Sequence, residues 1–96
     1  MVAAMHSAGV TCTSLHATND LIASDAGQCE LGSTTLNLDV YGSTADRDRA
    51  VQAAKRLVST GAALVGPNWT VGAVGRRSRP AMERIQGALG GEIVTL

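Results

Sequence analysis

The chain has 96 residues, of which 45% are hydrophobic, and this length and composition predict one globular domain. Its net charge is zero, yet residues 1–46 carry a net charge of −5 and residues 47–96 a net charge of +5. No stretch approaches the ~18 apolar residues of a membrane-spanning helix, and residues 1–9 lack the basic and long apolar regions of a signal peptide.

The interior is expected to be built from small aliphatic side chains, because Phe is absent and the only aromatic residues are Tyr41 and Trp69. Such a core buries little area per side chain, so a covalent cross-link would help to stabilise the domain. Trp69 is expected to anchor the core or a hairpin rather than to bind a ligand.

The first third of the chain predicts a short helix, a loop and a hairpin. Residues 2–8 are compatible with a helix that ends at Gly9, and residues 13–24 are polar and turn-rich, as in a loop. Strands are expected at 26–32 and 34–41, joined by a two-residue turn at Gly32 and Ser33.

The remainder alternates between helical and strand-like segments. Ser43 is expected to cap a helix that Gly61 ends, followed by strands at 62–66 and 69–74. A second helix begins at Ser78, with Pro80 in its first turn, and ends at Gly90 and Gly91 before a last strand at 92–96. Five apolar positions of the two helices match at an offset of 31 residues: Ala50/Ala81, Val51/Met82, Ala54/Ile85, Leu57/Ala88 and Val58/Leu89.

This repeat predicts an α+β fold with the ferredoxin-like βαββαβ arrangement, an antiparallel sheet with both helices on one face. The first unit would span 34–66 and the second 69–96, preceded by an N-terminal helix, loop and extra hairpin strand within 1–31. In that arrangement the strand at 34–41 already has two neighbours, so the hairpin partner at 26–32 has no free edge. The strand order is therefore left open.

Cys12 and Cys29 are the only cysteines, and a disulfide between them is the favoured interpretation. The alternative is a zinc site formed with His6 and His16, although the spacings match no standard finger and contain no CxxC pair. A reactive thiol is disfavoured because the surrounding segment is acidic. We therefore expect no metal and no cofactor.

Candidate catalytic residues are few. Ser14, His16, Asp20 and Asp25 are the residue types of a hydrolase, but they lie in one short polar segment without a nucleophile elbow, so we do not expect an enzyme.

Arg76, Arg77 and Arg79 precede and open the last helix. They form a candidate anion-binding site, with a solvated loop facing the acidic half as the simpler interpretation. Nucleic-acid binding is disfavoured because few aromatic residues are present to stack on bases.

Several segments together resemble a known group: AGVTC, GQCELG, VGPNWTV and IQGALGGEIV. They are similar to small uncharacterised secreted or lipid-anchored domains of high-GC Gram-positive bacteria and their phages. The resemblance implies a disulfide between Cys12 and Cys29 and a place at the cell envelope, with an export or lipid-anchor segment removed upstream. It implies no particular chemistry.

The sequence thus predicts a non-enzymatic domain of the cell envelope that acts through contact with an unidentified protein. If the source is a phage, exclusion of a second infection is one version of this function. The alternative is an intracellular regulator that binds anions or nucleic acid through Arg76, Arg77 and Arg79.

Overall fold

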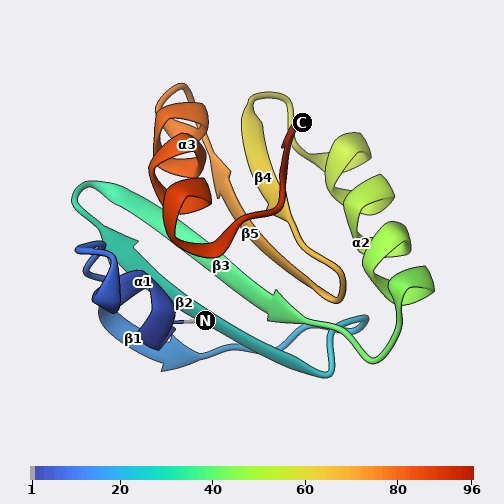
Figure 1. Ribbon diagram of the computed structural model, residues 1–96. Helices are drawn as coiled ribbons and strands as arrows, with labels where there is room; N and C mark the ends of the chain where they lie inside the picture. The colour runs from blue at the N-terminus through green and yellow to red at the C-terminus, as the bar shows by residue number, and fades with distance from the viewer. Residues whose placement is uncertain (1) are drawn as a thin grey trace.

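The computed structural model describes residues 2–96, and Met1 lies outside the described residues. Across residues 2–96, three helices and six strands follow one another (Figure 1). In order they are α1 (Val2–Ser7), β1 (Thr13–Ala17), β2 (Asp25–Leu31), β3 (Thr34–Val40), α2 (Thr44–Leu57), β4 (Gly61–Val65), β5 (Trp69–Val74), α3 (Ser78–Leu89) and β6 (Glu92–Thr95).

The six strands form one antiparallel sheet in the order β1-β2-β3-β5-β4-β6, which confirms the α+β class. The predicted hairpin is present: β2 and β3 pair from Asp25↔Val40 to Leu31↔Thr34. Its turn begins with Gly32 at φ +61°, a conformation that glycine adopts without steric cost.

The ferredoxin-like arrangement is not confirmed, because the strand order differs. That arrangement would place the last strand beside β3, but β2 already occupies this edge along the full length of β3. The last strand, β6, instead pairs with β4 at the far side of the sheet. The hairpin strand therefore has a free edge of β3 to pair with, because the last strand pairs with β4 instead.

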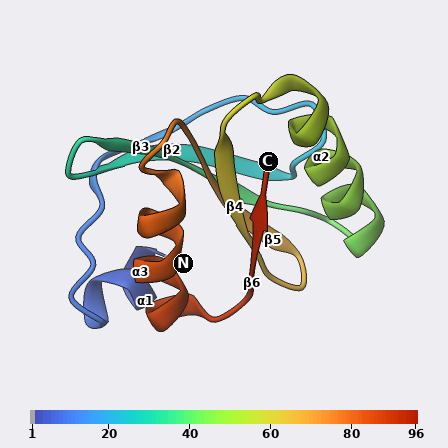
Figure 2. The same cartoon turned by 90° about the horizontal axis from the view of Figure 1, so that it is seen from above.

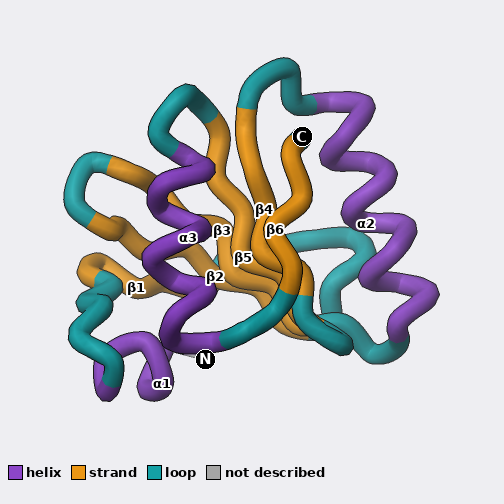
Figure 3. Tube along the Cα trace, turned by 45° about the horizontal axis from the view of Figure 1, so that its top comes forward, coloured by secondary structure: helices purple, strands orange, loops and turns teal. Residues whose placement is uncertain are grey.

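The predicted placement of both long helices on one face is wrong, and the strand order explains why. The crossovers β3–α2–β4 and β5–α3–β6 each join parallel strands and advance in the same direction across the sheet. Their strands point in opposite directions, so two right-handed crossovers must place their helices on opposite faces. Figures 2 and 3 show α3 and α2 on either side of the central strands.

The core lies between the sheet and α3, with α1 packed beside α3. Met82 and Ile85 of α3 are fully buried against Leu64 and Val71 of the central strands. The N-terminal segment contributes the fully buried Met5. Helix α2, in contrast, contains no buried residue.

Two local predictions need correction. Residues 13–17, predicted as loop, form the edge strand β1, in which all five side chains are exposed and no alternation marks a strand. Its pairing with β2 is interrupted by an irregularity after Thr13, where Ser14 has φ 55°. Gly61, predicted to end α2, is the buried first residue of β4, because the helix already ends at Leu57.

Candidate functional site

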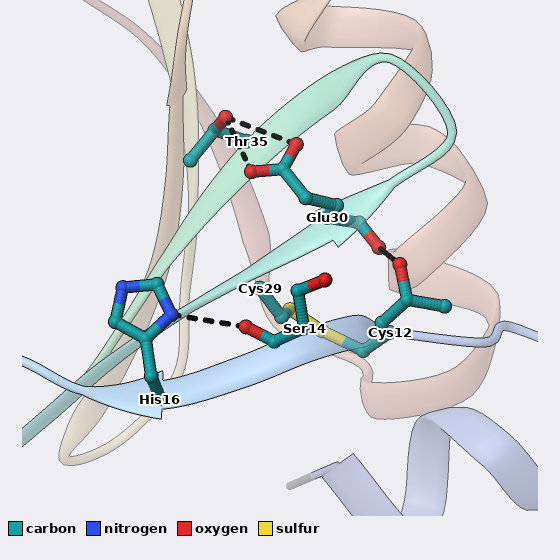
Figure 4. The surroundings of a disulfide bond; sticks show 7 residues. Cys12, Ser14, His16, Cys29, Glu30 and Thr35 are labelled. Atoms are coloured by element: carbon teal, nitrogen blue, oxygen red, sulfur yellow. Dashed lines mark hydrogen bonds between the residues drawn. A yellow bond between two sulfur atoms is a disulfide. The ribbon is translucent and has the colours of Figure 1, made fainter.

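The disulfide between Cys12 and Cys29 is confirmed, and it joins the segment before β1 to the middle of β2 (Figure 4). The two Cα atoms lie 5.5 Å apart, which suits a disulfide. Neither sulfur is then a thiolate, the form that zinc requires. Among residues 2–96, no group of three or more His, Cys, Asp and Glu side chains could hold a metal ion.

The hydrolase-like residues near β1 do not form a catalytic arrangement. Nδ1 of His16 lies 2.9 Å from the backbone carbonyl oxygen of Ser14, so it donates to the main chain instead of accepting from the hydroxyl (Figure 4). Asp20 accepts hydrogen bonds from the backbone N–H groups of Ile22 and Ala23 and thereby shapes the loop before β2. These contacts are structural.

The arginine cluster is only partly brought together. Arg76 and Arg77 line a shallow depression of about 530 Å³. Arg79 turns away to pair with Glu83 and to donate to the hydroxyl of Thr95. The other lining residues, mostly polar, come from the β2–β3 turn, from β3 and from the end of β5: Ser33, Thr34, Thr35, Asn37, Val74 and Gly75. We name this depression the arginine pocket.

The ion pairs of residues 2–96 do not neutralise the arginine pocket. All three lie within a helix, between residues no more than four apart: Arg47–Asp48, Arg49–Asp46 and Arg79–Glu83. Arg76 and Arg77 therefore take part in none of the ion pairs found within residues 2–96.

The structure has a cleft between α2 and the sheet, which the sequence analysis missed. Its volume of about 570 Å³ is in the range of small-ligand sites. Three exposed apolar side chains lie around it: Leu21 from the loop before β2, Leu57 from α2 and Val74 from β5. Exposed apolar side chains that line one concave site make it a candidate binding site. We name this feature the α2 cleft.

The floor of the α2 cleft is open over Gly72, in the middle of β5. A Cβ at this position would meet no atom within 4 Å, and the backbone is not in a left-handed conformation. Gly72 pairs with Asn37 of β3 and Ala63 of β4, and both also line the cleft. Glycine inside a strand often marks a place where another molecule approaches the backbone.

One end of the α2 cleft is acidic. Asp39 is half-buried there, near Asp20, and burial raises the pKa of Asp39 to about 6, with the charge of Asp20 adding to the shift. Oη of Tyr41 and Oγ1 of Thr70 lie 2.9 Å apart in a buried hydrogen bond beside it. A carboxyl group with a raised pKa in a concave site is a candidate functional group.

Helix α2 forms the side wall because it lies apart from the sheet. Its first turn is fixed by Ser43, whose hydroxyl accepts from the backbone N–H of Asp46, and by Arg47, which donates to the carbonyl oxygens of Gly66 and Pro67. Apolar residues of α2 and of its C-cap line the cleft: Ala50, Val51, Ala53, Ala54, Leu57 and Val58. The sequence held two signals for this site, the mid-strand Gly72 and the alanine-rich helix face.

No family model matches the chain, and no curated protein and no solved structure matches it either. Within residues 2–96, no helix has the length and apolar character needed to cross a membrane. The function is therefore inferred from the geometry of the chain itself.

Proposed function

We propose that this chain is a non-enzymatic binding domain that takes up a segment of another protein in the α2 cleft. The observation that carries the proposal is the open floor at Gly72, surrounded by the exposed side chains of Leu21, Leu57 and Val74. An occupant would cover apolar surface that water now contacts, and this burial would supply the main driving force.

The chemistry of the cleft favours an apolar side chain accompanied by a basic one. The apolar side chain fits over Gly72, against the alanine-rich face of α2. The basic group fits the acidic end, where it would neutralise Asp39 and Asp20. Complementary charges of this kind orient a partner more than they add affinity.

We further propose that the domain works outside the cytoplasm, at the cell envelope. The Cys12–Cys29 disulfide supports this location, because disulfides persist mainly in oxidising compartments. The resemblance to secreted and lipid-anchored domains points the same way, and a lipid anchor on the mature protein would hold the domain at a membrane. Exclusion of a second infection stays the specific version of this proposal for a phage source.

Selection from a displayed library of random octapeptides tests the binding function. Peptides that combine a large apolar residue with Lys or Arg should be enriched on the wild-type domain. The Gly72→Leu variant fills the floor of the cleft and should abolish their binding. Gly87→Leu is the matched control, since Gly87 lies exposed on α3 with no atom within 4 Å of an added Cβ. Enriched peptides that bind both variants equally would contradict the proposal.

A second candidate function is anion binding at the arginine pocket, favoured by the convergence of Arg76 and Arg77 with the hydroxyl-rich β2–β3 turn. Replacing Arg76, Arg77 and Arg79 by Ala should weaken binding to single-stranded DNA or RNA and reduce its salt dependence. If the wild-type protein binds neither nucleic acid at low salt, the intracellular regulator is ruled out.

A further inference from the structure

The α2 cleft and the arginine pocket lie on the same face of the sheet and share two lining residues, Asn37 and Val74. Alternate residues of a strand point to the same face, so the floor along β3 is formed by Asp39, Asn37 and Thr35. Because β3 and β5 are antiparallel, with Asn37 opposite Gly72, the floor continues on β5 through Thr70, Gly72 and Val74.

This floor has opposite charges at its two ends. Asp39, with Asp20 near it, lies at the end where β3 finishes and β5 begins. Arg76 and Arg77 follow β5 at the other end, beside the β2–β3 turn. Gly72 lies between them, with open space above it. Four residues of strand, a span of about 13 Å, separate Asp39 from Thr35, which lines the arginine pocket together with Arg76 and Arg77.

An extended ligand matches this spacing directly. In a β-strand, side chains i, i+2 and i+4 lie on one face and cover the same span of about 13 Å. A basic residue at one end then lies over Asp39, an apolar residue in the middle lies over Gly72, and an acidic residue at the other end reaches Arg76 and Arg77. The intervening side chains point away from the floor.

We propose that the α2 cleft and the arginine pocket form one groove for an extended peptide segment. We name it the bipolar groove, because its two ends carry opposite charges. The segment carries a basic, an apolar and an acidic side chain at alternate positions. This inference rests on the proposed binding function and specifies its ligand.

The test uses two acetylated and amidated pentapeptides, Lys-Thr-Leu-Thr-Glu and its reversed order Glu-Thr-Leu-Thr-Lys, so that both strand directions are sampled. Binding to the ¹⁵N-labelled disulfide-bonded protein is followed through the amide chemical shifts of Gly72 and Asn37, which detect millimolar affinity. We expect at least one order to bind, and to bind about fivefold more tightly than Thr-Thr-Leu-Thr-Thr.

A charge exchange then tests the arginine end. Arg76→Glu with Arg77→Glu should weaken binding of the preferred peptide about fivefold. The same variant should favour a peptide in which Lys replaces the Glu. Arg56→Glu with Arg84→Glu changes the net charge equally at exposed positions outside the groove and should leave this preference unchanged. Asp39→Asn should remove the preference for a basic residue at the opposite end.

The outcomes separate the two proposals. Binding that Gly72→Leu abolishes but that no charge exchange alters would overturn the bipolar groove and leave the binding function in place. If none of the peptides changes the chemical shift of Gly72 at millimolar concentration, both the bipolar groove and the binding function are overturned. A charge preference that both double Arg variants lose equally would reflect net charge alone and would also overturn the bipolar groove.

Discussion

The partly buried side chain of Trp69 packs against the core, and two glycines make room for it. A Cβ on Gly66 would overlap Cε2 of the indole, and one on Gly91 would lie 3.2 Å from Cη2 and 2.8 Å from the carbonyl oxygen of Val65. Trp69 thus acts as the anchor expected from the sequence, but the two glycines that it requires lie in different turns. Only the folded chain brings them to the indole.

Replacing Gly66 by Ala should lower the free energy of unfolding by about 2 kcal/mol, because the added methyl group forces the rigid indole to move. In a Trp69→Leu background the same replacement should cost less than about 1 kcal/mol, since the overlapping ring is gone. Urea denaturation of the four proteins measures both values. Gly87→Ala is the control, and it should raise the free energy of unfolding by about 0.5–1 kcal/mol as an exposed helical glycine. An equal cost of Gly66→Ala in both backgrounds would contradict this role of Trp69.

Asp39 should make stability depend on pH. Its pKa is raised from 3.8 to about 6 by burial and by Asp20, so the folded state retains a proton that the unfolded chain releases at lower pH. The folded state therefore binds more protons between these values, and the free energy of unfolding should fall as pH rises from about 4 to about 6. Asp39→Asn should lack this component, which urea denaturation at several pH values measures as a difference from wild type. Parallel pH curves for the two proteins would refute the assignment.

At the scale of elements, sequence reasoning succeeded where local signals agreed with packing. The β2–β3 hairpin follows from Gly32 and the alternation around Leu36 and Leu38, and both core residues are buried. Helix α3 follows from an apolar stripe that meets the core through Met82 and Ile85. The same stripe in α2 misled the prediction, since it faces an open cleft on the other side of the sheet.

The failures have a common physical cause. Strand β1 has no buried face, so its sequence carries no period of two, and only its backbone pairing with β2 and the disulfide nearby define it. The strand order depends on which edge of the central strands stays free once β2 has paired with β3, and this is a property of the tertiary structure. The site was missed for the same reason: Asp39, Gly72 and Arg76 belong to segments that become neighbours only through the pairing of β3 with β5.

Helix α2 should be less stable than α3, the other long helix. It has no buried residue, and Leu57 near its end is 85% exposed, whereas α3 buries four of its residues. Amide hydrogens of α2 should therefore exchange faster than those of α3, through local opening. Ser43→Ala removes the cap, at a cost of about 1 kcal/mol, and should accelerate exchange in α2 alone. Hydrogen exchange followed by mass spectrometry decides this, and equal acceleration in α3 would show that the two helices open together.

At the scale of the whole molecule, the charge division of the sequence becomes a spatial one. The acidic half supplies Asp20 and Asp39, and the basic half supplies Arg76 and Arg77, at opposite ends of one face of the sheet. Ion pairs among residues 2–96 remain local, so this separation is not cancelled inside the domain. The zero net charge of the chain therefore conceals a polar surface.

The N-terminal segment is held by two different means. Met5 and Val10 are part of the core beneath α3, whereas β1 pairs only with β2 and has no buried residue. The disulfide joins Cys12 to Cys29, with a sequence separation of 17, and so closes a loop that contains β1. Cross-linking a loop of this length stabilises the folded state by about 3 kcal/mol in the chain-entropy model. The bond is therefore expected to matter most for β1, which has little else to hold it.

Reduction of the disulfide should lower the free energy of unfolding by about 3 kcal/mol and release β1 before the rest of the sheet. Hydrogen exchange of the reduced protein should show lost protection at residues 13–17, with protection retained in β3, β4 and β5, whose pairing does not involve the cross-link. Reduction keeps both sulfur atoms, so it separates the cross-link from the cavity that Cys29→Ala would leave at a fully buried position. Simultaneous loss of protection in β1 and β5 would instead mean that the bond stabilises the whole domain as one cooperative unit.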